Sequence, residues 1–172
     1  MVPDPLRLVD EVRSRSPSAG SCLHGERHWQ AVGLAGVELA EEVPGADPEL
    51  VFLFALFHDA MRLNDDHDPG HGARGAGLAG ELHEESFRLD GDRFALLVEA
   101  CAGHTDGGLA TEPAVGVCWD ADRLNLWRVG RQPDPALLST EPARRPELIE
   151  AARAYHGNGP SWETLAGRLC GG

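Results

Sequence analysis

Histidine and acidic side chains are the residues of this sequence whose types and spacing suit metal chemistry. Eight histidines occur among the 172 residues, and His58 directly precedes Asp59 after the apolar run VFLFALF (51–57). Imidazole and carboxylate are ligands that borderline divalent metals prefer, and the two oxygens of one carboxylate can bridge two ions. Because successive residues of a helix lie about 100° apart, His58 and Asp59 can both reach one cavity. The dipeptide alone is weak evidence, since a carboxylate holds a buried histidine at least as often as a metal does.

Helices must position these residues, because the apolar spacing is helical along almost the whole chain. The predicted helices cover residues 5–15, 23–42, 47–63, 71–89, 93–104 and 114–130. Asp47 and Pro48 are typical of a helix start, and the all-round apolar body after them is typical of a central helix in a bundle. Prolines divide a weaker helical region at 132–172. We therefore predict an all-α, single-domain helical bundle over 1–172, with its core at 22–131.

The charge of the chain restricts its partners. All 15 basic residues are arginines, and 28 acidic residues bring the formal net charge to −13. Such a surface repels nucleic-acid duplexes and anionic membranes, whereas a local arginine pocket can still bind a small phosphorylated substrate. The longest apolar run is too short to span a bilayer. Four cysteines without a CxxC pair, and no signal peptide before them, favour free thiols and a cytoplasmic location.

Five segments resemble, in the same order, the HD-domain superfamily of metal-dependent phosphohydrolases. They are HGERHWQAVGLAGVELA (24–40), FHDAMRLNDD (57–66), HGARGA (71–76), CAGHTDGG (101–108) and WDADRLNLWRVG (119–130). The resemblance covers about 22–131 and implies a helical bundle of the HD type. It also implies a centre of two divalent ions (Mn, Fe, Co or Mg), with Asp59 as the bridge. The implied ligands are His28, His58, Asp59 and Asp122 for one ion, with His71 and His104 creating the second site.

Neighbouring polar residues leave alternatives open. Asp120 and Asp122 are two residues apart, so a helix directs them to different faces, and the apolar stripe through Trp119 and Leu126 favours Asp122 as the ligand. Asp120 is then expected to orient a ligand or to be solvated. His24 could share a face with His28, and a hydrogen-bonding or capping role is favoured over ligation. The sequence favours a local role for His67 and peripheral positions for His83 and His156, and Asn64, Asp65 and Asp106 could hold waters or orient ligands.

Arginines are the predicted substrate-binding residues. Arg62 lies one helical turn beyond His58, where many relatives of the HD superfamily have a lysine. An arginine stays protonated and offers a planar fork, so it suits phosphate anchoring better than acid catalysis. Arg74 and Arg123 are further candidates for substrate binding. The predicted catalytic residues are Asp59, as the bridge between the ions, and Arg62, which would stabilise charge on the phosphate oxygens.

The resemblance favours one function and leaves two others open. It implies hydrolysis of a small phosphate ester or nucleotide by metal-activated water. Some members of the superfamily use the same ligands to hold two irons and cleave a carbon bond with O₂, so an oxygenase is the first alternative. A non-catalytic metal- or ligand-binding module is the second. The glycine-tyrosine-proline motif of the cyclic-dinucleotide branch is absent near His104, which disfavours that substrate.

Overall fold

The protein is helical throughout the residues that its computed structural model describes, which are 2–105, 108–155 and 159–169. Within these ranges the elements are α-helices and 3-10 helices, and His83 and Phe87 form an isolated bridge. The predicted all-α fold is confirmed. Asp106 and His156, which the sequence analysis singled out, lie outside the described residues.

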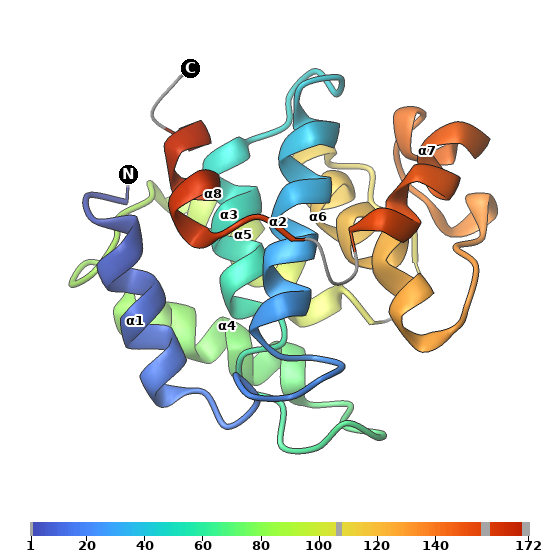
Figure 1. Ribbon diagram of the computed structural model, residues 1–172. Coiled ribbons are helices and arrows are strands. Elements are labelled where there is room, and N and C mark those ends of the chain that lie inside the picture. Colours follow the sequence, from blue (N-terminus) through green and yellow to red (C-terminus); the bar gives the residue numbers. More distant parts are fainter. Residues whose placement is uncertain (1, 106–107, 156–158, 170–172) are drawn as a thin grey trace.

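The elements follow the predicted order, and several helices are shorter than predicted (Figure 1). The α-helices are α1 (Pro5–Arg15), α2 (Glu26–Ala40), α3 (Pro48–Phe57), α4 (His71–Leu82), α5 (Gly91–Gly103), α6 (Pro113–Leu124), α7 (Pro146–Ala151) and α8 (Trp162–Leu169). The 3-10 helices are η1 (Asn125–Val129), η2 (Pro135–Leu137), η3 (Pro142–Arg144) and η4 (Ala152–Ala154). The prediction extended three helices too far: α3 ends before His58, α4 ends before the bridge at His83, and the segment after α6 tightens into η1.

Helix α3 forms the centre of the bundle, as its apolar composition predicts. Every residue from Leu50 to Phe57 is buried. Asp47 caps the helix by accepting hydrogen bonds from the backbone N–H groups of Glu49 and Leu50, and Pro48 occupies the first turn. Helices α2, α4, α5 and α6 all contact α3, so the residues at its carboxyl end lie where the other helices meet.

Two glycines of α4 allow this helix to approach its neighbours closely. A Cβ atom on Gly72 would collide with the carbonyl oxygen of Cys101 in α5, and one on Gly75 would collide with the carbonyl oxygen of Phe57 in α3. Larger residues at these positions would therefore separate the helices. The glycines bring the start of α4 against the ends of α3 and α5.

The C-terminal region packs on both sides of this core. In Figure 1, α8 lies against α1, α2 and α3, and α7 lies on the far side of α6. The buried Trp162 of α8 donates a hydrogen bond to Glu26 at the start of α2. None of the described helices has the length and apolarity that crossing a membrane requires.

Candidate metal centre

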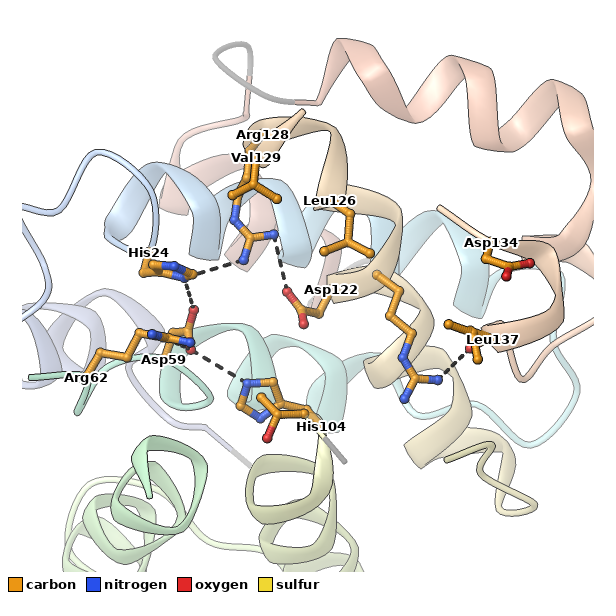
Figure 2. Close-up of a pocket in the computed structure, with 12 residues that line it drawn as sticks. His24, Asp59, Arg62, His104, Asp122, Leu126, Arg128, Val129, Asp134 and Leu137 are labelled. Carbon is orange, nitrogen blue, oxygen red and sulfur yellow. Dashed lines mark hydrogen bonds and ion pairs between the residues drawn. The ribbon is translucent and has the colours of Figure 1, made fainter. Parts of the chain in front are cut away.

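The fold brings the six predicted metal ligands together from five helical segments. Each lies at or near the end of its helix, which directs the side chains into one region between the helices. His28 lies in the first turn of α2, His58 and Asp59 follow α3, His71 begins α4, His104 follows α5, and Asp122 lies in the last turn of α6. Figure 2 shows three of them, Asp59, His104 and Asp122, around the pocket next to this region.

The carboxylate of Asp59, which is 2% exposed, lies between two pairs of histidines. Its Oδ2 atom is 3.6 Å from Nε2 of His28 and 3.7 Å from Nε2 of His58. Its Oδ1 atom is 3.0 Å from Nε2 of His71 and 3.6 Å from Nε2 of His104. Each pair together with Asp59 places its ligand atoms within 4.8 Å of one another, so each group could hold a metal ion.

Backbone carbonyls set the tautomers of three of these histidines. A carbonyl oxygen can only accept a hydrogen bond, so an Nδ1 atom that faces one carries the proton and leaves the lone pair on Nε2. The pairs are His58 Nδ1 with the carbonyls of Phe54 (3.1 Å) and Ala55 (3.2 Å), His71 Nδ1 with Asp68, and His104 Nδ1 with Cys101 (2.8 Å). All three side chains therefore present a metal-binding lone pair towards Asp59.

The Nε2 atoms within each histidine pair face each other at close range. They are 3.1 Å apart between His28 and His58, and 3.0 Å apart between His71 and His104. In the second pair both Nδ1 atoms carry the proton, so two lone pairs point at each other unless a cation or an extra proton lies nearby. This arrangement of donors fits a bound metal ion.

Asp122 joins the group that contains His28. Its Oδ1 atom is 3.2 Å from Nε2 of His28, yet this buried oxygen has no hydrogen-bond partner among the described residues. Nδ1 of His28 is likewise buried without a partner in the described part of the chain. The Asp122 oxygen lies near His28 and Arg128 but accepts no hydrogen bond in the described part of the chain, and buried polar groups are normally hydrogen-bonded, so it is able to accept a cation.

The electrostatics of the cluster favour neutral imidazoles at His28 and His58 and an ionised carboxylate at Asp59. Burial lowers the pKa of His28 to about 4 and that of His58 to about 3, so both imidazoles are neutral near pH 7. Burial opposes ionisation of Asp59, but His58, His104 and His24 outweigh it and hold its pKa well below the usual range. Burial also opposes protonation of His104, but its contact with Asp59 raises the pKa of His104 above the ordinary value. An ionised carboxylate thus lies among histidines of unequal basicity.

Two further side chains hold Asp59. His24 lies in the turn before α2, and its Nδ1 atom is 3.0 Å from Oδ2 of Asp59. Arg62 donates from Nε to Oδ1 of Asp59 at 3.0 Å, and its Nη1 group donates to the carbonyls of Asn64 and Asp66. Each oxygen of the Asp59 carboxylate is therefore held by a side chain of the protein, Oδ2 by His24 and Oδ1 by Arg62 (Figure 2).

A pocket of about 300 Å³ adjoins the cluster and reaches Asp59, His104 and Asp122. Three arginines line it, namely Arg62, Arg123 and Arg128, together with apolar residues that include Leu126 and Leu137. Arg74, a predicted substrate-binding residue, is not among its lining residues. Its guanidinium instead binds the carboxylate of Asp68 and the carbonyl of Met61, because the loop between α3 and α4 folds towards it.

Arg128 is a pocket residue that the sequence analysis did not single out. It donates to the carbonyls of Leu23 and Asn125, and its Nη1 atom is 3.7 Å from Oδ1 of Asp122. Figure 2 shows Arg128 between His24 and Asp122. One of its partners, Leu23, lies more than a hundred residues away, and the other, Asn125, lies in the 3-10 helix η1. Helical spacing therefore did not indicate that Arg128 lines the pocket.

Asp120 and the remaining described histidines lie outside the cluster. Asp120 is completely buried rather than solvated, and it accepts hydrogen bonds from the backbone of Ser139 and from both the backbone and hydroxyl of Thr140. It therefore attaches α6 to the C-terminal region. His67 is exposed in its turn, and His83 stacks on Phe94 with ring centroids 4.1 Å apart.

Comparisons with known proteins give no relative: no family model, curated protein or solved structure matches this chain. The geometry of the cluster is compatible with an HD-type centre, and the family itself stays a prediction from the sequence motifs.

Proposed function

We propose that this chain is a metal-dependent phosphohydrolase of the HD type that acts on a small phosphate ester or nucleotide. One observation carries the proposal. One oxygen of the buried Asp59 carboxylate lies beside His28 and His58, and the other oxygen lies beside His71 and His104. A carboxylate placed in this way suits two ions a short distance apart, which is a common arrangement for phosphoryl transfer. The sequence motifs that resemble the HD superfamily support the same chemistry.

The protein would hold the ions through Asp59, Asp122 and the four histidines His28, His58, His71 and His104. When bound, the ions supply Lewis-acid stabilisation of a phosphoryl group and lower the pKa of water at the centre. The backbone carbonyls at Nδ1 of His58, His71 and His104 keep these rings oriented before any ligand binds. The protein therefore contributes a preorganised set of donors.

Arg62, which lines the pocket beside the cluster, would bind the phosphate group. Guanidinium groups form paired, charge-assisted hydrogen bonds with phosphate oxygens. Arg62 has a second task, because its Nε group is already used to hold Asp59. Loss of Arg62 would therefore weaken both phosphate binding and the position of the carboxylate. The apolar side chains of Leu126 and Leu137 line the same pocket.

Metal content and phosphatase activity test this proposal together. Protein purified without chelator is analysed for metals, reconstituted with Mn²⁺ and assayed with p-nitrophenyl phosphate and small phosphomonoesters in the absence of O₂. We expect about two ions per chain and anaerobic phosphate release. Asp59→Asn should lower both, whereas the matched change Asp10→Asn, at an exposed residue of α1, should lower neither. Bound metal without release of phosphate from any ester would contradict a hydrolase.

An oxygenase is the second candidate, because each half of the cluster is a set of two histidines and one carboxylate. This set is typical of non-haem Fe(II) sites that react with O₂. Two irons in the purified protein, together with substrate-dependent O₂ consumption and no anaerobic phosphate release, would favour this alternative.

A further inference from the structure

Arg123 is a buried cation whose guanidinium is only partly paired within the described residues. It follows Asp122 in α6, is 8% exposed and lines the pocket beside the metal cluster. Its Nη1 group donates to the carbonyl of Leu137 at 2.6 Å, and its guanidinium lies 5.5 Å from the ring centroid of Trp119. Its Nη2 group is buried and has no hydrogen-bond partner among the described residues.

The other two arginines of the pocket each lie within ion-pair distance of a carboxylate. Arg62 pairs with Asp59, and Arg128 lies 3.7 Å from Asp122. The carboxylate of Asp120, one turn before Arg123 in α6, interacts electrostatically with Arg123, but its oxygens accept their hydrogen bonds from Ser139 and Thr140. A buried charge is costly unless it is paired. The partial compensation by the Leu137 carbonyl and the Trp119 ring leaves one donor group of Arg123 for a ligand.

We propose that Arg123 forms a subsite for a carboxylate on the alcohol portion of the substrate. This inference rests on the proposed phosphohydrolase function and narrows its substrate class to small phosphate monoesters of hydroxy acids. The phosphate would lie at Arg62 and the metal cluster, and the carboxylate would reach Arg123 in the same pocket. The carbon atoms between the two groups would contact Leu126 and Leu137.

The surroundings of Arg123 favour a carboxylate over a second phosphate. The free part of a guanidinium binds a planar carboxylate well. A second phosphate would bring about two more negative charges into a pocket that already contains the carboxylates of Asp122 and Asp134. The pocket volume of about 300 Å³ also limits the ligand to a small molecule.

A matched pair of probes tests the subsite, since 3-phosphoglycerate and glycerol 3-phosphate differ in having a carboxylate or a hydroxymethyl group. We expect the Mn²⁺-loaded protein to prefer 3-phosphoglycerate in kcat/KM by about ten- to a hundredfold, the range of one charge-assisted hydrogen bond. In Arg123→Gln this preference should fall towards one, mainly through KM for 3-phosphoglycerate. Arg123→Lys keeps the charge and should retain part of the preference.

Asp134→Asn provides a second variant that does not disturb the buried guanidinium. Asp134 is exposed at the pocket, and its side chain caps η2 by accepting from the backbone of Ala136, a contact that asparagine can keep. Removal of its charge should strengthen the binding of 3-phosphoglycerate by about two- to fivefold. Glycerol 3-phosphate should change less. If the preference for 3-phosphoglycerate over glycerol 3-phosphate is the same in wild type, Arg123→Gln and Asp134→Asn, the proposed carboxylate subsite is wrong.

Calorimetric titration of the two probes separates this inference from the proposed function. If the metal-loaded protein hydrolyses neither compound but binds 3-phosphoglycerate more tightly, and Arg123→Gln removes the difference, the carboxylate subsite stands and these esters are not substrates. If both are hydrolysed and bound equally well, the phosphohydrolase function stands and the subsite is wrong.

Discussion

His71 and His104 face each other through Nε2 atoms that are 3.0 Å apart, while the Nδ1 atom of each faces a backbone carbonyl. Both carbonyls require a proton on Nδ1, so two lone pairs are directed at each other and at Oδ1 of Asp59. Either an additional proton on one imidazole, which the raised pKa of His104 favours, or a metal cation relieves this repulsion. The folded protein is therefore expected to bind metal more tightly than the unfolded chain does.

Metal addition should accordingly raise the thermal stability of the chelator-treated protein. Mn²⁺ at a hundredfold excess over its dissociation constant stabilises a folded state by about 2.7 kcal/mol. For a chain of this length the melting temperature should rise by roughly 5–10 °C. Differential scanning calorimetry with and without Mn²⁺ measures the shift. His104→Gln should reduce it, whereas His67→Gln, at an exposed turn residue, should not; equal shifts in both variants would contradict the assignment of His104.

Asp120 and Asp122 should respond differently to the same substitution. Asp122→Asn changes an oxygen next to His28 and should weaken metal binding by about tenfold or more. Asp120→Asn places an amide donor against the donors of Ser139 and Thr140 and should destabilise the fold by about 1–3 kcal/mol. The number of ions bound by the folded Asp120→Asn protein should not change. Metal analysis and urea unfolding of both variants give the comparison. Loss of metal from the folded Asp120→Asn protein would contradict the assignment of Asp122, and not Asp120, as the metal ligand.

The sequence predicted the helical fold and the residues that meet at the cluster because both depend on local patterns. Apolar spacing marked the helices, and the resemblance of the histidine and aspartate motifs to the HD superfamily indicated Asp59 and the five residues around it. A hydrogen-bonding role was favoured for His24, but neither its partner Asp59 nor the contacts of Arg128 were predictable in this way. His24 reaches Asp59 from a turn before α2, and Arg128 crosses to the Leu23 carbonyl after α6 tightens into η1. Such contacts depend on loop conformation, which residue spacing does not determine.

Close packing of α4 should also be necessary for the cluster. Gly72→Ala introduces a methyl group against the Cys101 carbonyl and within 3.1 Å of Nδ1 of His104. We expect a loss of about 1–3 kcal/mol in unfolding free energy from overpacking and weaker binding of the metal at His71 and His104. Gly77→Ala is the matched control, because nothing lies within 4 Å of an added Cβ there. It should stabilise the helix by about 0.5–1 kcal/mol. Similar unfolding curves and metal affinities for the two variants would show that this close approach is unimportant.

The start of α3 should make stability depend on pH through Asp47. Partial burial opposes ionisation of this carboxylate, but hydrogen bonds from Arg93 and from the N–H groups of Leu50 and Glu49 lower its pKa below the ordinary value. A lowered pKa in the folded state contributes stability that is complete above the pKa of the unfolded chain and disappears as pH falls through the folded value. Arg93→Gln should thus be less stable than wild type near pH 7, and the difference in stability should shrink as Asp47 becomes protonated in acid.

Thermal unfolding of wild type and Arg93→Gln across this pH range measures the difference. Arg88→Gln, a substitution at an exposed arginine, controls for the change in net charge. A difference that is constant with pH would exclude the Asp47–Arg93 pair as its cause.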